Sequence, residues 1–453
     1  MVDLNIINGN VFIYNTLHKT GLSINNGKIV AIGKSRVLPS ADKTIDASGK
    51  VILPGVIDVH THIQDLDYAY RENYITGTKA AASGGVTTVL EMPLRLKGKN
   101  AVQSFDMQIN TMNKKSLIDF GVFGSAGYTT IDVIPELAQK GCCAFKTFMI
   151  NPPEEEAELQ DLAAKNDYYL LQIFSEIAKT GKVASVHAEN DSIITQTIEN
   201  LYSANKTDFA AHTESRPVAA EDEACTRALV LAYHTKVKLN LVHMSSKNSF
   251  FLIKKAKHIV DLTCEITPHH LFLTDEDGKK IGAWAKVDPP LRSQQHVDSA
   301  LKYFNDGTID MVASDHSPYG YSEKESNNIF ECGSGTPGIE TMLPVLLDAV
   351  NKNKTTLNRV VEATAIIPAH RFELSTKGKI AVNQDADLVL VDMNQEYMIR
   401  NRDMYTTPHV TIFDGRTIQG KIEKTIVRGH IVYDKGEFHQ DPGYGIYTGC
   451  VSN

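Results

Sequence analysis

Apolar and polar residues alternate in short runs at both ends of the chain. Near the N-terminus, "LSINNGKIVAIGK" alternates on either side of Asn26-Gly27, which predicts two strands joined by a two-residue hairpin turn. The C-terminal stretches "DADLVLVD" and "KIEKTIVRGHIVYDKGEF" have the same short-strand pattern. Because each end is small to fold alone, we expect residues 1–50 and 375–453 to form one composite β-rich domain, a small β-sandwich.

Between these ends, apolar runs alternate with amphipathic stretches such as "DSIITQTIENLYSA". Short continuous apolar runs are typical of parallel strands that are buried on both faces. Eight strand-helix units over about 320 residues predict an α/β fold with a (β/α)₈ barrel over residues 51–374. The eight runs are "GVIDVHTH", "VTTVLEMP", "IDFGVFGSA", "CCAFKTFM", "VASVHAEN", "KLNLVHMSS", "VDLTCEITPHH" and "IDMVASDHS".

One segment inside the barrel region is acidic. In "NPPEEEAELQ" (151–160), two prolines precede a run of carboxylates. This order predicts a solvated helix with an acidic first turn, and a lid beside a binding site is the alternative.

Composition and charge exclude several classes of protein. The net charge is −8 and no basic run is present, which argues against nucleic acid or an anionic membrane as the main partner. No apolar run approaches the roughly 20 residues of a membrane span, and the N-terminus has no secretion signal. The six cysteines show no CxxC pair, which favours a reducing compartment. We therefore expect a cytoplasmic globular protein.

Residues with metal-binding and acid–base chemistry follow the predicted strands. His60 and His62 end the first run and share one face, because side chains two apart on a strand point the same way. The fourth run contains Lys146, and the fifth, sixth and eighth runs contain His187, His243 and Asp315. Since the carboxyl ends of barrel strands meet at one rim, we expect these side chains to converge there. Imidazole and carboxylate are natural ligands for zinc and similar ions.

Each of these residues has an ordinary structural interpretation when it is considered alone. A single strand histidine is more often a core or surface residue than a ligand, and Asp315-His316 is compatible with a capping turn. We interpret the pair His269-His270 as a polar rim rather than as ligands.

Lys146 has two interpretations. It is either a buried lysine paired with an acid or an amine whose pKa is lowered by burial. A free amine can add carbon dioxide and become an anionic carbamate with two oxygens, which can hold two cations.

The ordered motifs "PGVIDVHTH", "FKTFM", "VHAEN", "VHMSS" and "ASDHSP" resemble those of the cyclic amidohydrolases: allantoinase, hydantoinase/dihydropyrimidinase and dihydroorotase. The resemblance covers nearly the whole chain. It implies that His60, His62 and Asp315 bind one divalent ion, that His187 and His243 bind a second, and that carboxylated Lys146 bridges them. Zinc is the first expectation, with manganese, cobalt and iron as alternatives. The resemblance also implies a homo-oligomer, either a tetramer or a dimer.

The implied reaction opens the ring of a cyclic amide or ureide. An activated water attacks the carbonyl carbon, and Asp315 acts first as general base and then as general acid toward the departing ring nitrogen. The products are a carboxylate and a ureido or carbamoyl amine.

Departures from the subfamilies bear on the substrate. Where dihydroorotases usually have Arg, Asn and His to bind the substrate carboxylate, this chain has Gln64, Leu94 and Tyr319. Loss of such a clamp costs about 1.5–3 kcal/mol per charge-assisted hydrogen bond, which disfavours dihydroorotate.

Three further residues are expected to contact the substrate, and two of them differ from the residues usual in the family. Asn151 replaces the tyrosine that hydantoinases carry five residues after the bridging lysine, and Asp288 replaces a Ser or Asn before "PPLR". Gly335, which opens "GTPGIETMLP", completes the set. We expect allantoin, which would be converted to allantoate, ahead of a hydantoin or a dihydropyrimidine.

Two rival functions remain open on the same fold. A catalytically inactive scaffold would have lost metal ligands, and a mononuclear deaminase would not use the strand-four lysine. Metal stoichiometry separates the three: two ions favour the binuclear hydrolase, one the deaminase and none the scaffold.

Overall fold

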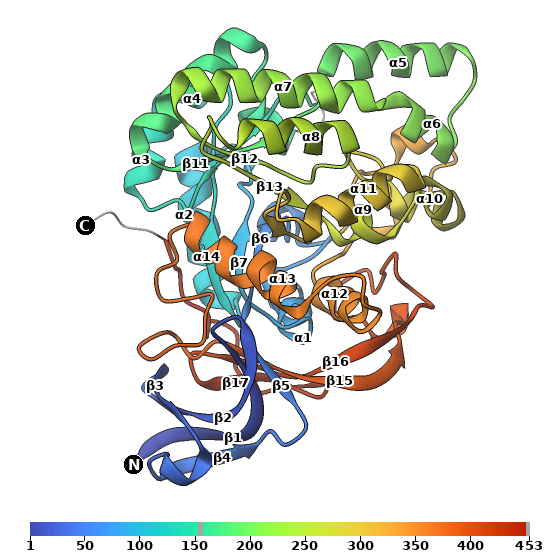
Figure 1. Cartoon of the computed structure of the whole chain (residues 1–453). Coiled ribbons are helices and arrows are strands. Elements are labelled where there is room, and N and C mark those ends of the chain that lie inside the picture. The colour runs from blue at the N-terminus through green and yellow to red at the C-terminus, as the bar shows by residue number, and fades with distance from the viewer. Residues whose placement is uncertain (153–156, 450–453) are drawn as a thin grey trace.

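The computed structural model describes all residues except 153–156 and 450–453 (Figure 1). Most of the carboxylates of the predicted acidic helix therefore lie outside the described residues. Ala157–Leu162, at its C-terminal side, form a short 3₁₀ helix, η4.

Parallel strands close into a barrel at eight positions, which confirms the predicted α/β fold. The backbone N–H of His62 donates to the carbonyl of His316 at 2.7 Å, and a parallel bridge joins Thr61 to His316, so the last strand meets the first. The third position is interrupted at Phe123 and is made of two short strands. The barrel strands are β6 (Val56–Thr61), β7 (Val86–Glu91), β8 (Asp119–Val122) with β9 (Gly124–Ser125), β10 (Phe145–Phe148), β11 (Val183–His187), β12 (Lys238–Leu241), β13 (Leu262–Ile266) and β14 (Met311–Val312).

Each predicted run contains one of these strands. The runs are continuous because the strands are covered on both faces. All six residues of β7, "VTTVLE", are buried, and so are all four of β10. A strand in this position needs apolar or internally bonded side chains on both faces, and this produces a continuous rather than an alternating pattern.

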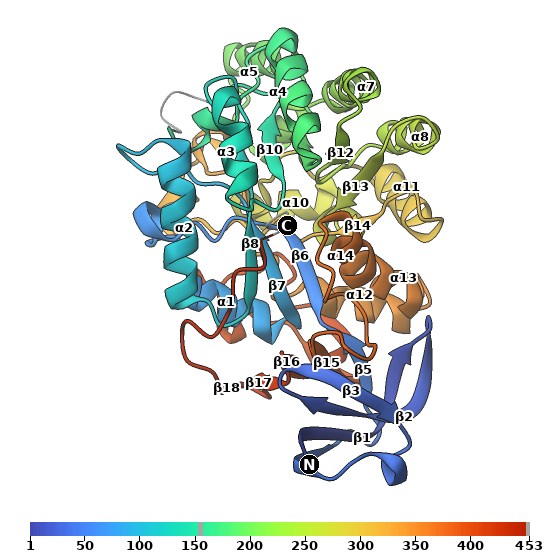
Figure 2. The ribbon, with the colours of Figure 1, turned by 90° about the vertical axis from the view of Figure 1, so that its left-hand side faces the viewer.

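Helices surround the strands, as Figure 2 shows. The segments after β11 and β13 are extended by extra helices, and these build one wall of the region above the strand ends. The helices are α1 (Tyr74–Ser83), α2 (Ala101–Lys115), α3 (Ile134–Gln139), α4 (Asp167–Thr180), α5 (Asp191–Ser203), α6 (Phe209–Ser215), α7 (Val218–Thr235), α8 (Lys247–Ala256), α9 (Pro268–Phe272), α10 (Asp275–Ile281), α11 (Gln294–Asn305), α12 (Met342–Asn351), α13 (Leu357–Val361) and α14 (Ile367–Arg371).

The two ends of the chain form a single sheet below the barrel (Figure 1). Its order is β18-β17-β16-β15-β5-β1-β2-β3, with β4 also paired to β1. The antiparallel pair β5–β15 joins the N-terminal to the C-terminal strands. The strands are β1 (Val2–Ile13), β2 (Thr16–Asn25), β3 (Lys28–Gly33), β4 (Ala41–Asp46), β5 (Val51–Pro54), β15 (Leu388–Met398), β16 (Thr417–Val427), β17 (His430–Asp434) and β18 (Glu437–Phe438).

This terminal sheet has its own apolar core, which includes Ile6, Leu22, Ile52 and Leu388. The predicted hairpin turn joins β2 to β3, with Asn26 and Gly27 both at positive φ, 49° and 75°. That conformation is the reason for the Asn-Gly sequence. The predicted domain boundaries near residues 50 and 375 stay a prediction. No helix in the described part of the chain is long and apolar enough to cross a membrane.

Buried ion pairs connect the terminal sheet to the barrel. Lys377 Nζ lies 2.7 Å from Asp119 Oδ2, at the start of β8, and 2.6 Å from Asp387 Oδ2, just before β15. Arg428 also pairs with Asp119. These ion pairs therefore hold the amino end of β8 against the terminal sheet.

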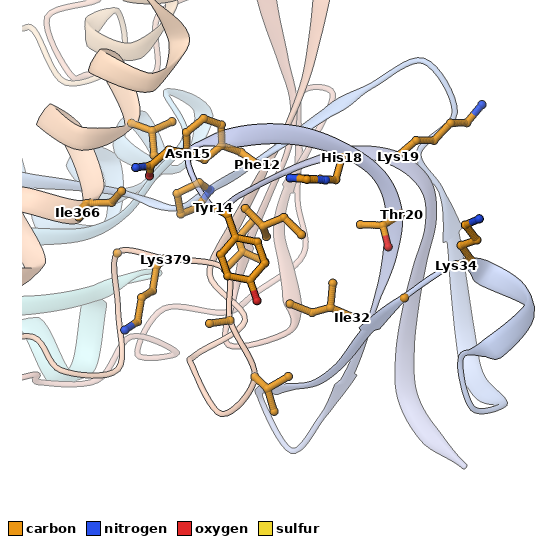
Figure 3. Close-up of a pocket in the computed structure, with 18 residues that line it drawn as sticks. Phe12, Tyr14, Asn15, His18, Lys19, Thr20, Ile32, Lys34, Ile366 and Lys379 are labelled. Atoms are coloured by element: carbon orange, nitrogen blue, oxygen red, sulfur yellow. The ribbon is translucent and has the colours of Figure 1, made fainter.

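A cavity of about 920 Å³ lies in this terminal region, between the β1–β2 hairpin and residues 378–382 (Figure 3). His18 is the one histidine among the described residues that line it, and none of those lining residues is a cysteine, aspartate or glutamate. Figure 3 shows Lys19 and Lys34 on one side of the view and Lys379 on the opposite side. The lining therefore offers no cluster of metal-binding side chains.

Candidate active site

The six residues expected to hold metal all lie at the carboxyl ends of barrel strands. His60 is in β6, Lys146 in β10 and His187 at the end of β11, whereas His62, His243 and Asp315 follow β6, β12 and β14. The parallel strand pairing aligns these ends, so residues up to 255 positions apart in sequence share one rim.

His60 lies at the centre of the group. Its Nε2 atom is 3.2 Å from His62 Nε2, 3.2 Å from Lys146 Nζ and 3.3 Å from Asp315 Oδ1. Asp315 Oδ1 is also 3.5 Å from His62 Nε2.

The remaining pair lies beside this group. His187 Nδ1 and His243 Nε2 are 3.2 Å apart, and the ring centroids of His243 and His60 are separated by 5.4 Å. The structure therefore brings all six side chains together.

Two buried glutamates orient the imidazoles. His60 Nδ1 donates to Glu265 Oε2 at 3.2 Å, and His187 Nε2 donates to Glu189 Oε2 at 2.8 Å. When one ring nitrogen of a neutral imidazole carries the proton, the other carries a lone pair. These bonds leave the lone pairs of His60 Nε2 and His187 Nδ1 directed at the cluster, which is how protein carboxylates usually support metal-binding histidines.

The electrostatics of the cluster favour neutral imidazoles. Burial lowers the pKa of His60 well below its usual value, with a further contribution from Lys146. Burial also lowers the pKa of His62 to about 3. Both rings are therefore uncharged at neutral pH and can act as ligands.

Lys146 is buried, with an exposed fraction of 1%, and its closest polar neighbour is an imidazole. No carboxylate among the described residues forms an ion pair with its Nζ. Burial lowers the pKa of Lys146 to about 8, against opposing contributions from Asp315 and Glu265. The salt-bridged alternative for this lysine is therefore not the arrangement found.

This donor set fits a divalent metal ion. The ligand atoms of His60, His243 and Asp315 all lie within 4.8 Å of one another. His243 Nδ1 has no hydrogen-bond partner in the described part of the chain, so no described group there competes for this ring nitrogen. Nitrogen and carboxylate ligands suit zinc and related ions.

The backbone is unusual at two of these positions. His243 and Asp315 adopt positive φ angles of 38° and 49°. Non-glycine residues rarely adopt such angles, and they cost about 1–3 kcal/mol where they occur. The strain places both side chains at the rim instead of continuing their strands.

A cavity of about 440 Å³ opens directly above the cluster. Five of the six expected substrate contacts line it: Gln64, Asn151, Asp288, Tyr319 and Gly335. Gln64 Oε1 accepts from Arg71 Nη1 at 3.1 Å, and the Arg71 guanidinium lies 4.3 Å from the centre of the Tyr319 ring. Asn151 is held by two hydrogen bonds to the carboxylate of Asp191, at 3.0 and 2.8 Å.

Leu94 is the exception. It is buried, with an exposed fraction of 3%, and is not part of the cavity wall. An apolar side chain at this turn packs into the protein interior, and a contact between Leu94 and substrate stays a prediction.

Several residues at the site were not predicted from the sequence. Glu265 and Glu189 form hydrogen bonds with His60 and His187, and Arg216, at the junction of α6 and α7, lines the cavity. Glu265 carried a signal of the same kind as Lys146, because it is the one charged residue in the strand-like stretch "LTCEI". His270, predicted as a rim residue, bonds to the carbonyl of Pro289 at 3.0 Å and does not join the cluster.

Nitrogen and carboxylate ligands gathered at the carboxyl rim of a (β/α)₈ barrel define a candidate metal centre of a hydrolase type. The chain belongs to the amidohydrolase family, whose model matches residues 51–432.

Relatives with several activities are similar to it. A dihydroorotase of Methanosarcina acetivorans is 34% identical over 98% of this chain and 95% of its own. An allantoinase of Bacillus licheniformis is 35% identical over 95% of this chain and 96% of its own. The solved structure of an L-hydantoinase (dihydropyrimidinase) from Arthrobacter aurescens has a TM-score of 0.95 and 31% identity, with 99% of each chain covered.

Proposed function

We propose that this protein is a binuclear-metal hydrolase that opens the ring of a cyclic amide or ureide, with allantoin as the first substrate. The observation that carries the proposal is the convergence of His60, His62, Lys146, His187, His243 and Asp315 at one rim, with Lys146 buried and unpaired with any described acid. The relatives named allantoinase, dihydroorotase and hydantoinase support the reaction class.

The residues would share two ions as follows. His60, His62 and Asp315 would hold one ion, and His187 and His243 the other. Lys146 would lie between them as its carbamate, formed when the amine nitrogen bonds to the carbon of carbon dioxide and loses one proton. Bound divalent ions would supply Lewis acidity and lower the pKa of water from 15.7 toward ~7.

The chain's own groups then handle the protons. Asp315 lies 3.3 Å from His60 Nε2 and lines the cavity, so it can accept a proton from the attacking water. The same carboxyl group can return the proton to the ring nitrogen as the carbon–nitrogen bond breaks. The products are one carboxylate and one ureido or carbamoyl amine.

The substrate choice depends on the residues of the cavity wall. The dihydroorotase relatives favour dihydroorotate, but Gln64 and Tyr319 stand where dihydroorotases usually carry carboxylate-binding residues. Arg71, the cation nearest to them, is engaged by Glu323 through Nε at 2.9 Å and Nη2 at 2.6 Å. A neutral ureide is therefore the better match, with a hydantoin or dihydropyrimidine as the second candidate.

The test is a panel of allantoin, hydantoin, dihydrouracil and dihydroorotate with metal-loaded enzyme. We expect kcat/KM for dihydroorotate to be at least about tenfold below that for the best neutral ring, because the carboxylate lacks a charged partner. Equal turnover of dihydroorotate would refute this interpretation of the wall.

Metal content of the same sample separates the rival functions. Two ions per chain support the binuclear hydrolase, one ion supports a deaminase-like site, and none supports an inactive scaffold. The expected homo-oligomer, the cytoplasmic location and zinc as the native metal stay predictions.

A further inference from the structure

His187 and His243, which would hold the second ion, are fixed in different ways. His187 Nε2 donates to Glu189 Oε2 at 2.8 Å, so a carboxylate sets the orientation of this ring. The His243 ring has no such partner, because its Nδ1 atom has no hydrogen bond in the described part of the chain and its Nε2 atom faces His187 Nδ1 at 3.2 Å. The position of the His243 ring therefore depends on where the backbone of its loop places it.

That loop leaves β12 in a strained conformation and is held just beyond the strained residue. His243 has a φ angle of 38°, which residues other than glycine rarely adopt. The backbone N–H groups of Ser245 and Ser246 both donate to Glu221 Oε1, at 2.9 and 2.8 Å. Glu221 belongs to α7 and is completely buried. Two charge-assisted bonds thus fix the loop two residues after His243.

The second oxygen of Glu221 is engaged by Arg292. Glu221 Oε2 lies 3.4 Å from Arg292 Nη2. The hydroxyl of Ser245 bridges the two groups, since it donates to Glu221 Oε2 and accepts from Arg292 Nε at 3.0 Å. Arg292 is also buried. A buried network of this kind, with its donors and acceptors engaged, makes the local structure rigid.

Arg292 connects this buried pair to the other imidazole. Its Nη1 atom donates to the backbone carbonyl of Arg216 at 2.5 Å. The Arg216 guanidinium pairs through Nη1 with Glu189, the carboxylate that holds the His187 ring. Nη2 of the same guanidinium lies 2.8 Å from Asp288 Oδ2. The buried pair therefore reaches both imidazoles of the second ion.

The residues expected at the first ion, His60, His62 and Asp315, are held by other groups. His60 Nδ1 donates to Glu265 Oε2 at 3.2 Å. The backbone N–H of His62 donates at 2.7 Å to the carbonyl of His316, the residue after Asp315. None of these bonds involves the buried pair. A change in the pair should therefore affect one ion and not the other.

We propose that Glu221 and Arg292 are positioning residues for the second ion. They hold His243 through its loop backbone and His187 through Arg216 and Glu189, so that both rings face one metal position. Hydrogen bonds behind metal ligands typically change metal affinity by about 10–100-fold. This inference rests on the proposed function, because it concerns one of the two ions of that same site.

The experiment measures the affinity and the location of each ion. Glu221→Gln keeps the shape of the side chain but replaces one carboxylate oxygen with an amide nitrogen, and Glu221→Asp keeps the charge but shortens the side chain by one methylene. Each purified protein is equilibrated with zinc buffers of decreasing free zinc concentration, and the zinc bound per chain is counted. Anomalous diffraction from crystals shows which ion remains, and the melting temperature reports on folding.

Asp222→Asn is the matched control. Asp222 is the neighbouring acid on α7 and accepts from the side chains of Ser246 and Ser249, at 2.6 and 2.8 Å, rather than from the backbone of the His243 loop. It tests whether loss of any negative charge at this point of the helix weakens metal binding.

We expect the wild type to hold two ions per chain. In both Glu221 variants the affinity for the second ion should fall by about 10–100-fold, while the affinity for the first ion stays within about threefold of the wild type. The bound zinc should therefore fall from two ions to one before the first ion leaves. Asp222→Asn should leave both affinities within about threefold of the wild type.

The results that would overturn the inference can be told apart from failure of the proposed function. If a folded Glu221 variant keeps the wild-type affinity for the second ion, or loses both ions together, the pair does not position that ion, while the proposed function stands. Failure of both variants to fold would assign the pair to stability and would also overturn the inference. If the wild type itself holds fewer than two ions, the proposed function fails and the inference fails with it.

Discussion

Two buried lysines at opposite ends of the barrel have contrasting surroundings. Lys377, at the amino end, is 6% exposed and lies within 3.4 Å of the carboxylates of Asp119, Asp385 and Asp387. Lys146, at the carboxyl end, is 1% exposed, has no ion pair with any described residue, and lies beside the imidazole of His60.

This difference distinguishes a lysine that is buried for stability from one that is buried for chemistry. A buried cation is tolerated when acids neutralise it, and Lys377 together with Asp119 and Asp387 joins the terminal sheet to the barrel in this way. An unpaired buried amine is costly, and such groups cluster at sites that use a shifted pKa. The fold thus keeps an uncompensated lysine at the end where chemistry is expected and a compensated one at the other.

Replacement of Lys146 should have the largest effect on activity. Lys146→Ala should reduce kcat/KM by at least about 10³-fold and remove bound metal, because the proposed bridging carbamate could not form. No ion pair is broken, so the variant should remain folded. Acetate or propionate should restore part of both properties, and turnover by the unrescued variant at the wild-type rate would exclude the carbamate. Metal analysis and steady-state kinetics measure the effect.

Replacement of Lys377 should act on stability instead. Lys377→Met leaves Asp387 without its buried cation, while Arg428 still pairs with Asp119. We expect the free energy of unfolding to fall by about 3 kcal/mol, the low end for a broken buried pair. Metal content and kcat of the folded protein should not change. Chemical denaturation measures the loss, and an unfolding free energy within 1 kcal/mol of the wild type would show that the pairing is not stabilising.

Replacement of Glu265 should have a smaller effect, which falls on metal affinity. Glu265→Gln weakens the bond that orients His60, so metal affinity should fall by about 10–100-fold. Glu340→Gln is the control, because Glu340 lies away from the cluster and accepts a hydrogen bond from the backbone N–H of Tyr405 at 2.9 Å. Competition with a chelator measures both affinities. An unchanged affinity in Glu265→Gln would mean that the His60 orientation is set by packing alone.

The barrel could be predicted from sequence because its strands are buried on both faces and are separated by amphipathic helices. The gathering of His60, Lys146, His187 and Asp315 followed from that fold, since the carboxyl ends of parallel strands meet. The chain from His187 through Glu189 and Arg216 to Asp288 could not be predicted. Its members come from the end of β11 and the loop after it, the α6–α7 junction and the segment between α10 and α11, and no local periodicity encodes such pairings. The packing of Leu94 into the interior could not be predicted either, because sequence position alone does not show which way a side chain packs.

The most direct test is anomalous diffraction from crystals of the metal-loaded protein grown with bicarbonate. We expect two metal ions, one beside His60, His62 and Asp315 and one beside His187 and His243, with additional density for a carboxyl group on Lys146 between them. A bare Lys146 amine with no ion nearby would contradict it.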